Sequence, residues 1–335
     1  MTSLLKTRYS RLETGPCSAR QILTIGLINN MPDEALRTTE RQFADLVGAS
    51  AGDIDIRLRV FALDRVPRSP GALGYLRARY EPASALLDTK IDALIITGAQ
   101  PRAVRLSDEP YWRELTELID WAKDNTRSTV FSCLAAHAGV LHLDGIERRP
   151  LPEKCFGVFA FTGQRDHPFV GKQGRPRLIP HSRYNGLLQS DLERAGYDIL
   201  ASSPVHGVDS FAKTAVSQFV FLQGHPEYDA NSLAHEYRRD MGRYLRGDLE
   251  RAPSIPAGYF NLEAEAELSA LERRARDGQR QLLLQELSKI DALAPPQAEW
   301  RGAAVSFYRN WIGSIVASTF RKPVRARKAE LSPLT

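Results

Sequence analysis

Short apolar runs, rich in aliphatic and β-branched residues, recur along the chain and predict buried strands. Each run is followed by a turn or by a helical pattern. The second run alternates apolar with polar residues, which is typical of a strand nearer the edge of a sheet. The predicted strands cover residues 22–28, 54–61, 91–97, 129–132 and 218–222.

Residues 110–123 separate two of these strands and carry apolar side chains at helical spacings of three and four. The order strand, helix, strand implies a right-handed crossover between parallel strands. We therefore predict an α/β fold with a doubly wound, mainly parallel sheet. In such sheets the functional side chains gather at the carboxyl ends of the strands.

The region 262–294 departs from this alternation. It mixes acidic residues and arginines with spaced leucines, which predicts an amphipathic helix, or two helices broken near Asp277 and Gly278. Pro295 and Pro296 end it. We interpret the region as a helical insertion packed on the main domain, with a contact in a homodimer as the alternative. The predicted organisation is an extension at 1–21, an α/β domain at 22–260, the insertion at 261–299, a returning segment at 300–320 and a basic tail at 321–335.

Composition and charge narrow the functional classes. With 335 residues, 43% of them hydrophobic, the chain is long enough to bury a large core. The net charge of +5 comes from 45 basic and 40 acidic residues, a balance that gives little support to nucleic-acid binding. Five basic residues gather near the end without interleaved aromatics, which favours a solvated tail: Arg321, Lys322, Arg325, Arg327 and Lys328.

The sequence offers neither a signal-peptide pattern at its start nor an apolar run long enough to span a membrane. We therefore expect a cytoplasmic protein without a membrane partner. The three cysteines, Cys17, Cys133 and Cys155, lack the paired spacing of a zinc site or a disulfide framework. Reduced thiols and no metal site are the expectation.

Cys133 stands where an apolar strand stops and a helical pattern begins. The N–H groups and dipole of a helix N-terminus stabilise a thiolate, lower the pKa of the thiol and supply donors to an oxyanion. Several hydrolases present their nucleophile on such a strand-to-helix elbow. The alternative is that Cys133 is a buried, small apolar residue of the core.

A second elbow strengthens the functional interpretation. Residues 223–228 follow another apolar strand and contain His225 and Glu227. At the end of a neighbouring parallel strand, His225 would serve as the base and Glu227 would orient its ring. Together with Cys133 they form the set of nucleophile, base and acid that nucleophilic catalysis requires.

With these residues in view, the chain resembles the homoserine O-acyltransferases, and in particular the O-succinyltransferases of methionine biosynthesis. Their fold is akin to that of class I glutamine amidotransferases. The similarity extends over about residues 22–260 and 300–320. Its motifs include Asn30, Met31 and Pro32 with Thr39 and Glu40; the turn 97–99 before Tyr111 and Trp112; Cys133; Glu153 and Lys154; the run 180–184; and the run 224–229.

The resemblance implies an acyl-CoA-dependent O-acyltransferase that acts on homoserine by a ping-pong mechanism, with acyl-CoA as co-substrate and no bound cofactor. Cys133 would form the acyl thioester, and His225 would accept the proton with Glu227 as its partner. Lys154, Ser182 and Arg239 would bind substrate. The role of Arg239 is chemically apt, since a guanidinium pairs bidentately with an amino-acid carboxylate. Without the resemblance, Lys154, Arg183 and Arg239 would be interpreted as solvated surface charges.

The sequence also departs from the family. Arg102 occupies a position that usually holds glycine or glutamate and is associated with acyl-donor choice, so we assign it to acyl-donor specificity, with a preference for the succinyl group. The stretch 32–40 is longer than usual, the helix after Cys133 is atypical, and the region 262–294 is extra. Substrate identity is therefore less firmly predicted than reaction class.

Three alternatives remain: a glutamine amidotransferase, an acyltransferase for another hydroxy or amino acceptor, and a catalytically silent binding protein. Ser132 stands where amidotransferases usually have glycine before the nucleophile, and the run 180–184 is acyltransferase-like. The complete triad opposes a silent protein. For the enzyme, backbone N–H groups near Leu134 and at the Gly98 turn are the candidate oxyanion donors.

Overall fold

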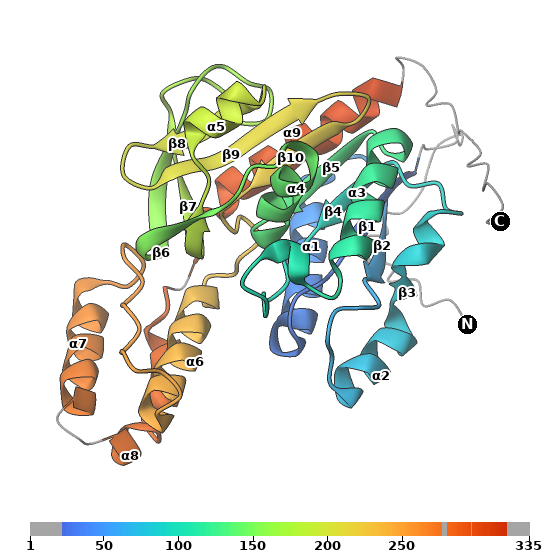
Figure 1. Ribbon diagram of the computed structural model, residues 1–335. Coiled ribbons are helices and arrows are strands. Elements are labelled where there is room, and N and C mark those ends of the chain that lie inside the picture. Colours follow the sequence, from blue (N-terminus) through green and yellow to red (C-terminus); the bar gives the residue numbers. More distant parts are fainter. Residues whose placement is uncertain (1–21, 277–279, 296, 320–335) are drawn as a thin grey trace, which may run out of the picture.

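The computed structural model describes residues 22–276, 280–295 and 297–319. The predicted N-terminal extension, the basic tail, Cys17 and the expected break at Asp277 and Gly278 lie outside these residues. Within them, a mixed sheet runs through the molecule, with helices on both of its faces (Figure 1).

The sheet has ten strands in the described residues, in the order β3-β2-β1-β4-β5-β10-β9-β8-β6-β7. The pairings from β3 to β10 are parallel, and those from β10 to β7 are antiparallel. The strands are β1 (Leu23–Ile28), β2 (Ile56–Ala62), β3 (Glu81–Pro82), β4 (Ala93–Ile96), β5 (Ser128–Ser132), β6 (Arg149–Gly163), β7 (Pro176–Gly186), β8 (Asp198–Ser203), β9 (Gly207–Thr214) and β10 (Gln218–Leu222).

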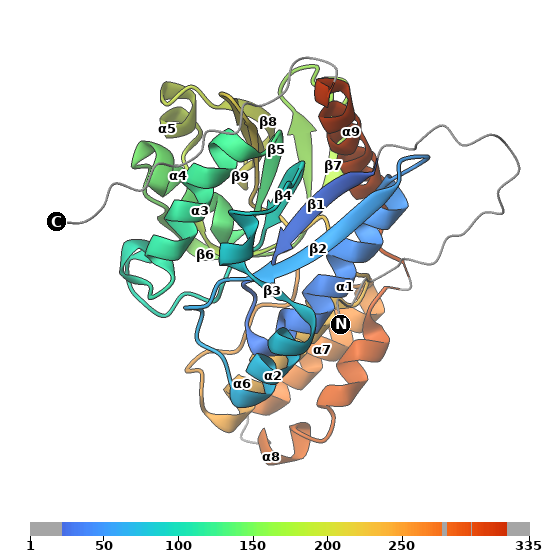
Figure 2. The ribbon, with the colours of Figure 1, turned by 90° about the vertical axis from the view of Figure 1, so that its right-hand side faces the viewer.

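Two hydrophobic clusters sandwich the sheet, one on each face. Val130 of β5 faces the cluster that contains α1 and α9, whereas its neighbour Phe131 faces the cluster that contains α3, α4 and α5. Figure 2 shows α1 and α9 on one side of the sheet and α3 and α4 on the other. These helices are α1 (Asp33–Ser50), α3 (Trp112–Asn125), α4 (Leu134–Asp144), α5 (Gln189–Arg194) and α9 (Arg301–Thr319).

A third cluster forms a helical lobe below the antiparallel end of the sheet (Figure 1). Tyr237 and Met241 of α6 are fully buried there against Leu268 and Leu283 of the following helices. The lobe combines α6 (Ser232–Arg246), α7 (Leu262–Arg276), α8 (Arg280–Leu283) and the 3-10 turn η3 (Leu287–Leu293). The remaining short elements are α2 (Pro70–Arg79), η1 (Ala83–Leu86) and η2 (Leu106–Asp108).

The structure confirms the predicted α/β fold and shifts some of the predicted boundaries. The strand expected at 54–61 begins at Ile56, because Ile54 closes a turn by donating its N–H to the Ala51 carbonyl (3.1 Å). The helix expected at 110–123 begins at Trp112. The amphipathic pattern at 262–294 contains the helices α7 and α8, and a 3-10 turn follows them at Leu287–Leu293.

Among the described residues, no helix is both long enough and apolar enough to cross a bilayer.

Candidate active site

Cys133 occupies a strained elbow between β5 and α4. It is the one non-glycine residue with a positive φ in the described part of the chain, at 54°. Its N–H donates to the Leu222 carbonyl of β10 (2.7 Å), and its own carbonyl accepts from Ala136 in the first turn of α4 (3.0 Å). Both bonds hold the residue in a conformation that side chains rarely adopt, as is common at functional sites. The elbow leaves Cys133 partly accessible.

His225 lies beside Cys133 because β10 pairs directly with β5, with Leu222 opposite Ser132. Its Nδ1 is 2.8 Å from Glu227 Oε1, and both side chains are buried. Burial by itself lowers the pKa of His225. The charges of Cys133 and Glu227, and the hydrogen bonds to both, outweigh burial and raise that pKa well above its ordinary value. The raised pKa favours the imidazolium form of His225 beside Cys133.

The segment that carries His225 is held in place by hydrogen bonds to the antiparallel half of the sheet. Asp209 Oδ1 accepts from the Gly224 N–H (3.2 Å), and the Pro180 carbonyl accepts from the His225 N–H (2.8 Å). A Cβ atom on Gly224 would lie 2.8 Å from both Asp209 Oδ1 and His181 Nε2, so the close approach requires glycine. The loop that carries His225 is therefore packed directly on β7 and β9.

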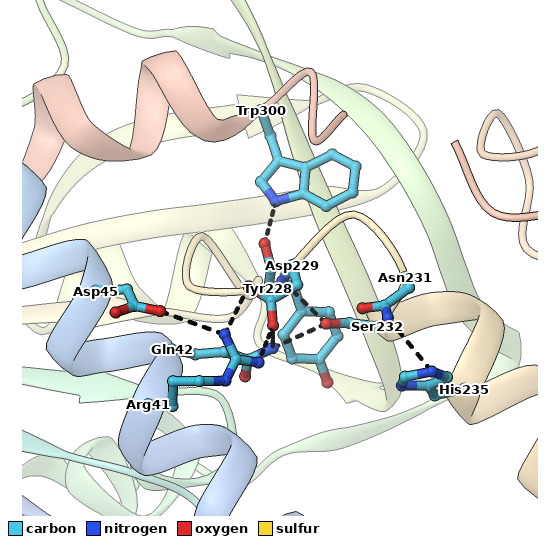
Figure 3. A network of polar contacts seen from close by, with 9 residues as sticks. All are labelled: Arg41, Gln42, Asp45, Tyr228, Asp229, Asn231, Ser232, His235 and Trp300. Carbon is cyan, nitrogen blue, oxygen red and sulfur yellow. Dashed lines mark hydrogen bonds and ion pairs between the residues drawn. The ribbon is translucent and has the colours of Figure 1, made fainter. Parts of the chain in front are cut away.

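The residues after Glu227 are held by side chains of α1, of α6 and of the turn before α9 (Figure 3). The Trp300 indole, just before α9, donates to the Tyr228 carbonyl (2.9 Å). Gln42 of α1 donates to Asp229 (3.1 Å) and to Ser232 at the start of α6 (2.9 Å), and Arg41 forms an ion pair with Asp229. The Tyr228 ring stacks on His225 with centroids 4.2 Å apart. Distant segments thus converge to fix the orientation of His225.

The predicted oxyanion donors lie next to one another. The Gly98 turn follows β4 and contacts the start of α4 so closely that a Cβ on Gly98 would lie 3.0 Å from the Leu134 nitrogen. The preceding Thr97 hydroxyl accepts from the Asn30 N–H (2.8 Å) and fixes this turn. The backbone N–H groups of the turn and of Leu134 are therefore near enough to share one oxyanion.

The three predicted substrate-binding residues converge on two acidic side chains of α6. Lys154 Nζ is 3.3 Å from Asp240 and 3.9 Å from Glu236. Ser182 Oγ donates to Glu236 (2.6 Å), and Arg239 Nε donates to Asp240 (2.8 Å). Burial raises the pKa of Asp240, but Arg239 and Lys154 more than offset this and hold it below its usual value. The Lys154 side chain is 9% exposed, whereas the Arg239 side chain is 55% exposed.

Tyr228 connects this acidic cluster to the triad. Its hydroxyl donates to Glu236 (2.5 Å), while its ring stacks on His225. Sequence reasoning did not single out Glu236, Asp240 or a role for Tyr228. The helical spacing of residues 236, 239 and 240 puts them on one face of α6, but nothing in the sequence shows that β6 and β7 pack against that face.

Arg102 lies on the exposed loop between β4 and η2. Its backbone N–H and that of Ala103 both donate to Glu109 Oε1 (2.5 and 2.7 Å). Its guanidinium makes no ion pair or hydrogen bond within the described ranges. The loop backbone is therefore fixed while the charge remains free to meet a ligand.

The remaining described cysteine differs from Cys133. Cys155 of β6 is buried, and burial raises the pKa of its thiol. A thiol that resists ionisation is a poor nucleophile. Among the described residues, no group of three or more histidine, cysteine or acidic side chains is arranged to hold a metal ion.

The family model for homoserine O-succinyltransferases matches residues 13–321. The chain belongs to this family. The predicted resemblance is thereby confirmed, and the protein is an acyltransferase.

Individual relatives agree with the family model. The homoserine O-succinyltransferase of Rhodopseudomonas palustris is 46% identical over 301 residues, which cover 90% of each chain. That of Bradyrhizobium japonicum is 48% identical over 292 residues, 87% of this chain and 89% of its own. Among solved structures, a glutamine amidotransferase from Methylobacillus flagellatus is similar at 16% identity and a TM-score of 0.48, covering 87% of this chain and 94% of that one.

Proposed function

We propose that the protein transfers the succinyl group of succinyl-CoA to the hydroxyl of homoserine through an acyl-enzyme on Cys133. The observation that carries the proposal is the strained Cys133 elbow facing the hydrogen-bonded pair of His225 and Glu227, in a chain of this family. The names of the relatives indicate homoserine as the acceptor and a succinyl group as the group transferred. The site has a cysteine that can accept an acyl group and charged side chains that can bind an amino acid.

In the first half-reaction the Cys133 thiolate attacks the thioester carbonyl. The oxyanion that forms lies against the N–H groups near Gly98 and Leu134. The carbon–sulfur bond to CoA then breaks, and the departing CoA sulfur takes the proton of the His225 imidazolium. The products are free CoA thiol and a neutral His225 beside the acylated Cys133.

In the second half-reaction neutral His225 takes the proton of the acceptor hydroxyl while its oxygen attacks the acyl-enzyme carbonyl. The carbon–sulfur bond to Cys133 breaks and restores the thiolate beside the imidazolium. Arg239 holds the acceptor carboxylate, and Lys154 and Ser182 contact the same two acidic side chains of α6 as Arg239 does. The negative Glu236 and Asp240 suit the acceptor's ammonium group.

Product analysis tests the proposal. The protein with succinyl-CoA and homoserine should release CoA thiol and form O-succinylhomoserine. If acetyl-CoA releases CoA thiol and succinyl-CoA does not, the donor is acetyl-CoA. If product forms only with another hydroxy or amino acid, that compound is the acceptor in place of homoserine. Ammonia release from glutamine without acyl transfer would make the chain an amidotransferase.

Arg239→Lys is expected to raise the KM for the acceptor by about ten- to hundredfold and to leave the donor KM within about threefold. The ammonium retains the charge but loses the two parallel donors that match a carboxylate. Initial rates at varied homoserine and varied succinyl-CoA measure both constants. Arg238→Lys is the matched control, since the neighbouring Arg238 pairs with Asp291 in the helical lobe. Equal increases in both KM values would show that Arg239 does not bind the acceptor specifically.

Arg102→Ala is expected to reduce the preference for succinyl-CoA over acetyl-CoA by about three- to tenfold. The guanidinium attracts the free carboxylate of the succinyl chain, and its exposure to water limits the effect. The ratio of kcat/KM for the two donors is the measurement. Arg105→Ala is the control, since Arg105 lies on the same loop and is bonded to Ser107. An unchanged ratio would place Arg102 outside the acyl subsite.

A further inference from the structure

The ring of Tyr228 covers one face of the proposed base. The centroids of the Tyr228 and His225 rings are 4.2 Å apart and the two planes differ by 19°, so the phenol face lies against the imidazole face. The face of an aromatic ring carries partial negative charge, and a cation within about 6 Å of the centroid is attracted to it. The contact therefore favours the imidazolium form of His225 over the neutral ring.

A tight turn brings the two rings together. The Tyr228 N–H donates to the His225 carbonyl (3.1 Å) and closes a four-residue turn with Pro226 in its second position, where the fixed φ of proline is favourable. The Trp300 indole donates to the Tyr228 carbonyl (2.9 Å) and holds the end of this turn (Figure 3). Both polar groups of the Tyr228 backbone are thus engaged.

The far end of the tyrosine is anchored as well. Its hydroxyl donates to Glu236 Oε1 (2.5 Å), while Ser182 donates to Glu236 Oε2 (2.6 Å). Burial, together with the charges of Glu236 and Glu227, raises the pKa of Tyr228 well above its ordinary value, so the hydroxyl stays protonated and remains a donor. A ring held at both ends keeps His225 in one orientation, with Nδ1 toward Glu227.

The other groups around His225 act differently from this ring. Imidazole N–H groups lie in the ring plane, so the hydrogen bonds to Cys133 and Glu227 act at its edge. On the sheet side, a Cβ on the preceding glycine would lie 2.8 Å from both His181 Nε2 and Asp209 Oδ1. Burial lowers the pKa of His181 to about 4, so this neighbour is uncharged at neutral pH. Within the described residues, Tyr228 supplies the one aromatic ring stacked on His225.

We propose that Tyr228 is a positioning residue: the face of its ring stabilises the imidazolium of His225, and its bond to Glu236 keeps that ring in place. This inference rests on the proposed function, in which the imidazolium protonates the departing CoA sulfur. Tyr228 thereby links the base to the carboxylate on which the proposed acceptor-binding side chains converge.

Two substitutions separate the ring face from the hydroxyl. Tyr228→Leu keeps apolar volume but removes the face, so the pKa of His225 falls. The alkaline limb of donor kcat/KM should then move to lower pH by about 0.5 to 1 unit, and the plateau should fall by about ten- to hundredfold. Tyr228→Phe keeps the face and should leave the limb within about 0.2 unit and the plateau within about fivefold. Tyr237→Leu is the matched control. It removes a buried tyrosine of α6 that packs on Phe260, and it should leave the limb in place.

Fluorinated phenylalanines at position 228 test the same contact with almost no change of shape, which covers the case in which Tyr228→Leu does not fold. Each added fluorine withdraws negative charge from the ring face. The pKa of His225 should therefore fall stepwise from phenylalanine to the difluoro and the trifluoro ring. Nitrogen NMR of isotope-labelled histidines, assigned with His225→Gln, measures this pKa without any substrate.

A pKa of His225 that stays fixed along the fluorinated series would overturn the inference. So would an equal shift of the limb in Tyr228→Phe and Tyr228→Leu, which would assign the effect to the hydroxyl, or an equal shift in Tyr237→Leu, which would assign it to loosening of the helical lobe. The titration without substrate keeps this test separate from that of the proposed function. If the pKa of His225 follows the ring face while no acyl transfer is found, the contact stands and the proposed function fails.

Discussion

Cys133→Ala is expected to lower acyl transfer by about 10⁶-fold, to the detection limit, and to eliminate the acyl adduct. Removal of the sulfur removes the covalent intermediate itself, and neither His225 nor the oxyanion donors can replace it. The fold should persist within about 1 kcal/mol, because alanine retains the Cβ that already sits at positive φ and the site is partly accessible. Steady-state rates, intact mass after incubation with succinyl-CoA, and thermal unfolding are the measurements.

Cys155→Ala provides the matched control, since it removes the one other described thiol. That variant should retain the adduct and most of the rate, at some loss of stability because Cys155 is buried. An adduct that persists in Cys133→Ala would contradict the assignment and move the nucleophile to Cys155 or to Cys17.

The sequence predicted five strands of the parallel half, β1, β2, β4, β5 and β10, from short apolar runs closed by turns, and missed the two-residue β3 at the edge. The strand at Gln218–Leu222 was predicted to the residue, since glycine and proline end its apolar run. The boundary error at Ile54 has a physical cause. The apolar period reports which side chains are buried, and Ile54 packs on the core although its backbone forms a turn.

The antiparallel half was not predicted. β6 contains two prolines and two glycines, and β7 contains prolines and several charged or polar residues, so neither has the pattern of a buried strand. These strands are nevertheless half of the site: they supply Lys154 and Ser182, and Pro180 supports His225. The family resemblance identified Lys154 and Ser182 one by one. Their convergence on Glu236 and Asp240 depends on how β6 and β7 pack against α6, which no local sequence pattern indicates.

The elbows followed more directly from the sequence. Cys133, His225 and the Gly98 turn each stand at the carboxyl end of a strand, and β4, β5 and β10 are consecutive in the sheet. Side chains at one edge of adjacent parallel strands must lie close together, so the local pattern was enough to bring them into one site.

Glu227→Gln is expected to lower kcat by about 10²- to 10⁴-fold while the protein stays folded. The amide matches the carboxylate in size and still offers an oxygen to the His225 ring, but it removes a negative charge 2.8 Å from Nδ1. The imidazolium then loses one of the two charges that raise its pKa, and the ring is less firmly held in the tautomer that faces Cys133.

The pH profile gives this variant a signature that a merely structural defect would lack. In the proposed mechanism the Cys133 thiolate is paired with the His225 imidazolium, and that imidazolium also protonates the departing CoA sulfur. Rates therefore fall on the alkaline side as His225 loses its proton, at a pH well above its ordinary pKa because Cys133 and Glu227 raise that pKa. Loss of the Glu227 charge lowers the pKa of His225, so the alkaline limb of donor kcat/KM should move to lower pH.

Asp229→Asn is the control. It alters the contacts of Asp229 with Arg41 and Gln42, two residues from Glu227, and should leave the alkaline limb in place. A limb that stays fixed in Glu227→Gln would mean that Glu227 does not set the protonation of His225.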